Sequence, residues 1–118
     1  MKKNIKKFFC SFVCAIRGIK TMYVREQSFR IQTVIAIIVI GLALYLGIAG
    51  FEWLLILTII GAVLSFEVFN STVEKMLDFI HPEDDSKIKV IKDISAAAVF
   101  IASLMAIIIG LIIFIPYF

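Results

Sequence analysis

The sequence predicts an all-α integral membrane protein, in which an N-terminal amphipathic surface helix precedes three transmembrane helices. Hydrophobic residues make up 62% of the 118 residues, whereas a soluble domain contains about 45–50%. These residues are gathered in three long apolar runs, and the basic residues are confined to the stretches around them. The length allows one small domain, so we expect 1–118 to form a single membrane domain.

Residues 1–30 are expected to form the surface helix region. Bulky apolar residues recur there at intervals of about three and four, which is the spacing of one stripe on a helix, and lysine and arginine lie largely on the other side. Such a helix lies in the membrane interface, where anionic headgroups attract it. No small-x-small cleavage site follows the short apolar run, so we expect the segment to be retained. The charge comes without a nucleic-acid-binding motif, and the two cysteines, Cys10 and Cys14, are too few for a disulfide framework.

Three transmembrane helices are predicted, over 31–51, 53–80 and 90–117. The first run carries no charge between Arg30 and Glu52, which is enough to cross a core about 30 Å thick. A glycine-containing turn is predicted over 47–51, at the end of this run. The second helix is longer than one crossing requires, so its last turns are expected to protrude. Pro82 is expected to stop it, and the polar stretch 81–89 to form a loop.

The distribution of lysine and arginine predicts the orientation in the membrane. None of the twelve lies in 31–74 or after Lys92. Because cytoplasmic loops carry an excess of these residues, we expect the N-terminus and the 81–92 loop to lie in the cytoplasm. The 47–52 turn and the C-terminus would then lie on the outer side of the membrane.

The second span carries a stripe of polar residues, and this stripe is the main indication of function. At 100° per residue, four polar side chains fall within about 80° of arc: Glu67, Asn70, Glu74 and Asp78. A charge inside a membrane span costs about 2.5–3.5 kcal/mol on insertion scales. Three carboxylates on one face therefore indicate a functional site. Hydrogen bonding between helices is the structural alternative, for which Asn70 and Ser71 alone would suffice.

Two kinds of site are compatible with this stripe, namely a cation or proton path and a metal site for phosphoryl transfer. Carboxylates bind Mg²⁺, which also binds nucleotide phosphates. The starts of the other two spans carry further charged residues, which favour the second kind: Glu26, Arg30, Lys92 and Asp93. Taken alone, these residues are compatible with interfacial ion pairs or snorkelling anchors. The alternative of a different class is a non-enzymatic ion-conducting or scaffold oligomer, which would not respond to nucleotide.

The same clusters resemble the prokaryotic diacylglycerol kinase and undecaprenol kinase family of small membrane kinases. Four segments carry the resemblance: SFVCAIRGI at 11–19, E-x-x-F-R at 26–30, E-x-x-N-S-x-x-E-x-x-x-D at 67–78 and K-x-x-K-D-x-x-A-x-A-V at 89–99. The segments KDISAAAV and EWLLIL look more like the Gram-positive undecaprenol kinase branch. In addition, Gln32 stands where the Gram-negative diacylglycerol kinases carry an acidic residue.

The resemblance implies an ATP-dependent kinase that phosphorylates the primary hydroxyl of a membrane lipid. Undecaprenol is the first expected substrate and diacylglycerol the alternative. A homotrimer with active sites shared between neighbouring chains is also implied, as is Mg²⁺ bound with ATP.

The resemblance further implies roles for individual residues. Glu67 would be the general base, and Glu26 and Glu74 would hold Mg²⁺. The nucleotide would be bound by Ser11, Ala15, Gly18, Glu26, Asn70, Glu74, Lys92 and Asp93. Arg30 and Asp78 would support the site.

Overall fold

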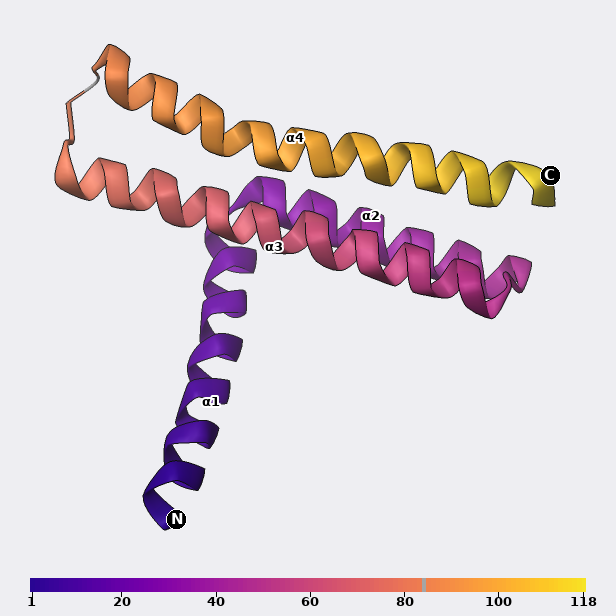
Figure 1. Ribbon diagram of the computed structural model, residues 1–118, viewed down its shortest axis with the longest axis horizontal. Helices are drawn as coiled ribbons and strands as arrows, with labels where there is room; N and C mark the ends of the chain where they lie inside the picture. The colour runs from indigo at the N-terminus through magenta and orange to yellow at the C-terminus, as the bar shows by residue number, and fades with distance from the viewer. Residues whose placement is uncertain (84) are drawn as a thin grey trace.

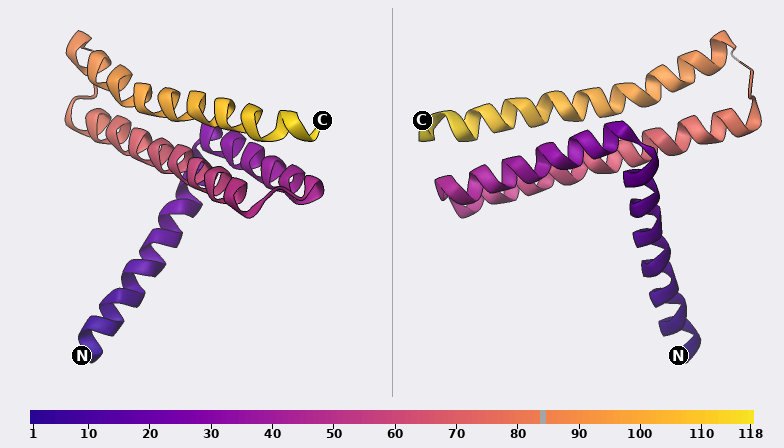
Figure 2. Two further views of the ribbon diagram at one scale, coloured as in Figure 1. Left: turned by 45° about the vertical axis from the view of Figure 1, so that its right-hand side comes forward. Right: turned by 180° about the vertical axis from the view of Figure 1, so that it is seen from behind.

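The computed structural model describes residues 1–83 and 85–118, and this part of the chain is almost entirely helical. Its elements are α1 (Lys2–Arg25), α2 (Gln27–Leu46), α3 (Gly50–Ile80), α4 (Ser86–Phe114) and the short 3₁₀ helix η1 (Ile115–Tyr117). Helices α2, α3 and α4 lie side by side, and α1 projects away from them (Figure 1; Figure 2). Each of the three is long and apolar enough to cross a membrane. The predicted fold class is therefore confirmed.

The direction of α1 is set by a break in the helical backbone at Glu26. This residue has an extended conformation (φ −109°, ψ 110°) and separates α1 from α2. Arg30 ties the two helices together, because its Nη1 donates to the carbonyl oxygens of Tyr23 at 3.0 Å and Val24 at 2.7 Å. Met22 is the buried residue of α1, and the rest of this helix is exposed. Such a helix, leaving the bundle where a span begins, is suited to lie along a membrane surface.

The turn between α2 and α3 is shorter than the sequence predicts. Gly47 adopts a left-handed conformation (φ 63°), which glycine tolerates without steric cost and which ends α2 at Leu46. Glu52 in the first turn of α3 then accepts a hydrogen bond from the backbone N–H of Ala49 at 3.0 Å. The first span therefore occupies Gln27–Leu46, whereas the prediction was 31–51.

The connection between α3 and α4 is also shorter than predicted. Helix α3 ends at Ile80, two residues before Pro82, and α4 begins at Ser86 inside the predicted loop 81–89. Asp85 explains the early start, because its side chain accepts from the backbone N–H of Lys87 at 3.0 Å and so caps the helix. Asp84, which the predicted loop includes, lies outside the described residues.

The apolar core lies at the end of the bundle opposite α1. It contains Ala43 of α2, Ile48 of the turn, Ile56 of α3 and Ile113 of α4. Most other apolar side chains of the three spans are exposed, as expected for helices whose solvent is lipid. Ala102 of α4 is buried, and Ala98, Ala106 and Gly110, which continue its four-residue spacing, are half-buried. The buried apolar cluster therefore lies at one end of the bundle, and the polar stripe of α3 lies toward the other.

Candidate active site

The polar stripe of α3 runs from the interior of the bundle to its exposed end. Glu67 and Ser71 are buried, with 5% and 2% of their surface exposed. Asn70 and Glu74 are half-buried, and Asp78 is exposed. The end of α3 that carries the exposed part of this stripe extends past the α1–α2 junction, together with the start of α4 (Figure 1). The predicted carboxylates therefore lie at the end of the bundle from which α1 departs.

Glu67 is held by a side chain from α2. The Nε2 of Gln32 donates to Oε2 of Glu67 at 3.1 Å and also approaches Oγ of Ser28 at 3.4 Å. Among the described residues, no other side chain or backbone group donates to the Glu67 carboxylate. The Oε1 of Gln32 is itself buried and has no partner within the described chain. This pair thus contains a carboxylate held through one oxygen and an amide with an unused acceptor.

Asn70 and Glu74 form the next pair along the stripe. The Nδ2 of Asn70 lies 3.4 Å from Oε1 of Glu74, a long hydrogen bond between residues one turn apart. The Oδ1 of Asn70 is buried, and no described residue donates to it. A buried acceptor left unpaired costs about 1–3 kcal/mol, and such a group calls for an ion, a water molecule or a ligand. The pair therefore offers oxygen atoms to something that the chain itself does not supply.

Two ion pairs connect α3 with the rest of the site. Lys75 Nζ lies 2.8 Å from Oε1 of Glu26, and Lys92 Nζ lies 2.7 Å from Oδ1 of Asp78. The first pair joins α3 to the α1–α2 junction, and the second joins it to α4. Glu26 and Arg30 lie four positions apart, a spacing that is compatible with an interfacial ion pair between them. In the structure Glu26 contacts Lys75 instead, because the guanidinium of Arg30 is directed at the carbonyl groups that end α1.

The other residues predicted to bind the nucleotide do not contact the polar stripe of α3 within one chain. Ser11, Ala15 and Gly18 lie exposed on α1, within about 60° of arc of one another and of Met22. Asp93 lies exposed on α4. Within the described chain, no hydrogen bond or ion pair joins these four predicted residues to the carboxylates of α3. One copy of the chain therefore assembles only part of the predicted nucleotide set.

The residues present fit Mg²⁺ shared with a nucleotide better than a metal enclosed by protein. The described residues include no group of three His, Cys, Asp or Glu side chains arranged to hold a metal ion. Mg²⁺ is usually bound through one or two carboxylates, with phosphate and water oxygens completing its shell. Glu74, with the unpaired amide oxygen of Asn70 beside it, offers ligands of this kind.

An apolar groove of about 580 Å³ runs between α2, α3 and α4. Its lining extends from Gln32 along the bundle to Phe118 and is mostly aliphatic, as at Val39, Ile60 and Ile107. Gln32 lines this groove and also holds Glu67. The groove thus combines a long apolar surface with a polar end next to the buried carboxylate.

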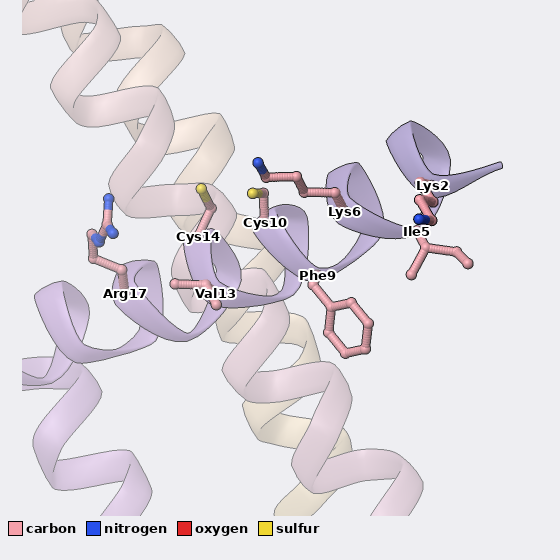
Figure 3. Close-up of a pocket in the computed structure, with 8 residues that line it drawn as sticks. All are labelled: Lys2, Ile5, Lys6, Phe9, Cys10, Val13, Cys14 and Arg17. Carbon is pink, nitrogen blue, oxygen red and sulfur yellow. The ribbon is translucent and has the colours of Figure 1, made fainter.

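A second hollow, of about 520 Å³, is lined by residues of α1 alone (Figure 3). Figure 3 shows the side chains of Lys6, Phe9, Cys10 and Cys14 among those arranged along this helix. Because no other helix contributes to its lining, this hollow is a face of α1 and not an enclosed site.

Two contacts of the site involve residues that are not among the predicted ones. Gln32 holds Glu67, and Lys75 holds Glu26. A signal for each is present in the sequence. Gln32 carries the one side-chain amide of the predicted first span 31–51, and Lys75 is the sole lysine or arginine between Arg30 and Lys87.

Comparison with known proteins places this chain in a family. The profile of the family described as prokaryotic diacylglycerol kinase matches residues 13–114. The chain is 32% identical to an undecaprenol kinase of Bacillus subtilis (strain 168) over 115 residues, which are 98% of this chain and 94% of that protein. It is 35% identical to a diacylglycerol kinase of Helicobacter pylori (strain ATCC 700392 / 26695) over 97 residues, 81% of this chain and 75% of that protein. For the diacylglycerol kinase of Escherichia coli (strain K12) the identity is 27% over 92 residues, 78% of this chain and 75% of that protein.

The region matched by the family profile contains α2, α3 and α4 in full, and with them the polar stripe and its contacts with Gln32 and Lys92. The relatives that cover most of this chain are all named as lipid kinases. This chain therefore belongs to the prokaryotic diacylglycerol kinase family of membrane lipid kinases.

Proposed function

We propose that this protein is a Mg²⁺- and ATP-dependent kinase that phosphorylates the primary hydroxyl of undecaprenol. The observation that carries the proposal is the position of Glu67. This buried carboxylate contacts Gln32, which lines the polar end of the apolar groove. A long lipid chain lying in the groove would bring a terminal hydroxyl to the level of the carboxylate. The groove would contact the apolar chain of the lipid, and the Glu67 carboxylate would react with its hydroxyl group.

The choice of undecaprenol is supported by the extent of similarity. The undecaprenol kinase of B. subtilis aligns over nearly the whole of both chains, whereas the diacylglycerol kinases align over 75% of their length. Diacylglycerol is the second candidate substrate, because the family description and those relatives name it. Both lipids present a primary hydroxyl at the membrane interface.

Glu67 would act as the general base of the transfer. It would accept the proton of the lipid hydroxyl while the hydroxyl oxygen attacks the γ-phosphorus of ATP. The new bond between lipid oxygen and phosphorus would form as the bond to the β–γ bridging oxygen breaks, and ADP would leave with the electron pair of that bond. Because Gln32 holds one oxygen of Glu67, the other oxygen remains to take the proton.

The nucleotide would lie at the exposed end of the stripe. Glu26 and Glu74 would hold Mg²⁺, which when bound neutralises charge on the transferred phosphate. Glu26 would have to leave Lys75 to do so. Lys92 would contact phosphate, and Asp78, its partner in the structure, would set its position.

A homotrimer with shared active sites would explain why some predicted nucleotide residues do not contact the carboxylates of α3 within one chain. Ser11, Ala15 and Gly18 form one face of α1, which projects away from its own bundle (Figure 2). In an assembly, this face would meet the nucleotide site of a neighbouring chain, to which Asp93 would also contribute. The bacterial relatives support a location in the bacterial cytoplasmic membrane. The distribution of basic residues supports an orientation with the N-terminus inside and the C-terminus outside.

The test of this function is phosphate transfer from γ-labelled ATP by the purified protein in mixed micelles that contain equal amounts of undecaprenol and diacylglycerol. The expected result is label mainly in undecaprenyl phosphate. Label mainly in phosphatidic acid would establish the second candidate and overturn the first. Label in neither lipid, with no effect of Mg·ATP on thermal unfolding, would overturn the kinase assignment for this chain.

A further inference from the structure

The contact between Gln32 and Glu67 spans two helices and is the sole hydrogen bond of that carboxylate within the described chain. Glu67 is 5% exposed, so water has little access to replace a lost partner. The donor is a neutral amide, which can fix a carboxylate without neutralising it. The hydrogen bond from Gln32 therefore engages Oε2 of Glu67, while Oε1 has no partner among the described residues.

Packing alone does not explain a glutamine at this position. The groove around Gln32 is lined mostly by aliphatic side chains, and a methionine of the same length would fill the space without a buried polar group. Instead, the Oε1 of Gln32 is buried with no partner in the described chain, which is unfavourable in a purely structural residue. The unpaired amide oxygen of Gln32 is thus unfavourable for stability. The partner of this amide outside its own helix, among the described residues, is Glu67.

The charged groups around this pair are occupied elsewhere. On α2, Arg30 donates to backbone carbonyls of α1. On α3, Glu74 is contacted by Asn70. On α4, Lys92 lies against Asp78. Among the described residues, no lysine or arginine forms an ion pair with Glu67, so the orientation of this carboxylate depends on the amide of Gln32.

We propose that Gln32 is a positioning residue that acts through Glu67. Its Nε2–H fixes Oε2 of the carboxylate and presents Oε1 to the lipid hydroxyl that enters along the groove. This inference rests on the proposed function, in which Glu67 is the general base, and adds a residue on which the base depends. A change at Gln32 should therefore lower the rate of transfer and leave nucleotide binding intact.

The central variant is Gln32→Met, which keeps the length of the side chain and removes the donor. We expect kcat to fall about 10- to 100-fold, the range for a reacting group displaced by a fraction of an ångström to an ångström. The KM for Mg·ATP should stay within about twofold, since the nucleotide residues lie farther along α3. Gln32→His, which supplies an N–H of similar reach, should retain most of the wild-type kcat. Thr33→Val is the matched control, because the Thr33 hydroxyl bonds only to Phe29 O of its own helix.

A double variant separates positioning from a general loss of structure. If Gln32 acts through Glu67, then Gln32→Met should cause no further loss of kcat in a Glu67→Gln background, as expected for residues that work as one unit. A loss of the same size in both backgrounds would overturn the proposal, and so would a Gln32→Met kcat above half of the wild-type value. Gln32→Ala serves as the second variant should Gln32→Met not purify as a folded protein.

A spectroscopic measurement tests the contact independently of turnover. The carboxylate stretch of Glu67 can be isolated as the infrared difference between the wild type and Glu67→Gln. We expect this band to shift in Gln32→Met and to stay near its wild-type position in Gln32→His. An unshifted band would overturn the proposal even if the protein is an active kinase. Conversely, a shifted band in a protein that phosphorylates neither lipid would leave the contact established and overturn the proposed function.

Discussion

Lys75 Nζ lies 2.8 Å from Oε1 of Glu26 and joins α3 to the break between α1 and α2. Lys75 also follows Glu74 directly in the chain. A positive group of the protein thus contacts one of the two carboxylates proposed to hold Mg²⁺ and is the sequence neighbour of the other. The side chain of Lys75 is half exposed and that of Glu26 is a quarter exposed, so this pair can open without a large desolvation change.

The first prediction concerns competition between Lys75 and the metal. Lys75→Met should lower the Mg²⁺ concentration required for half-maximal transfer by about 1.4- to fivefold. An exposed ion pair is worth about 0.2–1 kcal/mol, and that amount no longer has to be overcome when the metal takes Glu26. The measurement is a Mg²⁺ titration of initial rates at fixed ATP.

Lys87→Met is the control for this titration, because it removes the same charge from an exposed position in the first turn of α4. Its Mg²⁺ requirement should match that of the wild type. An unchanged or increased requirement in Lys75→Met would show that Lys75 does not compete with the metal at Glu26.

The second prediction concerns the general base. Glu67→Gln should reduce transfer by about 100-fold or more, the usual contribution of a positioned base. The amide is isosteric with the carboxylate and can accept from Gln32 through its own oxygen, so the fold and nucleotide binding should persist. The measurement pairs initial rates with thermal unfolding in the presence of Mg·ATP. Retention of more than a few per cent of activity with normal protection by nucleotide would assign the base to another group.

The third prediction concerns nucleotide binding at the exposed end of the stripe. Glu74→Ala should abolish the thermal protection given by Mg·ATP, because it removes a proposed metal ligand and the acceptor for Asn70. Thr72→Val is the matched control, since the Thr72 hydroxyl is exposed and bonds to Val68 O of its own helix. Protection should be normal in this control. Equal protection in both variants would exclude Glu74 from the metal site.

Much of the fold follows from patterns that are local in the sequence. Uninterrupted apolar runs predict the three spans, and the boundary errors arise from single residues whose conformation a hydropathy pattern does not report. Gly47 ends the first span through its left-handed backbone, and Asp85 starts the third early by capping it. Both residues are of types favoured at such positions, but the apolar pattern continues past Gly47 and begins only after Asp85.

The sequence predicts which residues of α3 belong to the site, but not which residues of the other helices contact them. Helical spacing places Glu67, Glu74 and Asp78 on one face, because that relationship depends on a single helix. The contacts Gln32–Glu67 and Lys75–Glu26 join residues 35 and 49 positions apart. They depend on how far α3 extends past the start of α2. No spacing rule within one helix reports that relative placement.

The last prediction concerns the junction that directs α1. Arg30→Met should loosen the last turn of α1, because the two carbonyl groups that the guanidinium holds lose a charged donor worth about 1.5–3 kcal/mol per hydrogen bond. Arg30→Lys should restore the junction only in part, since a lysine lacks the planar arrangement of several N–H donors. The measurement is tryptic cleavage after Arg25 in detergent, which we expect to accelerate in the order wild type, Arg30→Lys, Arg30→Met. Arg17→Met, in the exposed middle of α1, should leave the rate unchanged. Equal cleavage rates in all four proteins would mean that the extended backbone at Glu26, and not Arg30, determines the direction of α1.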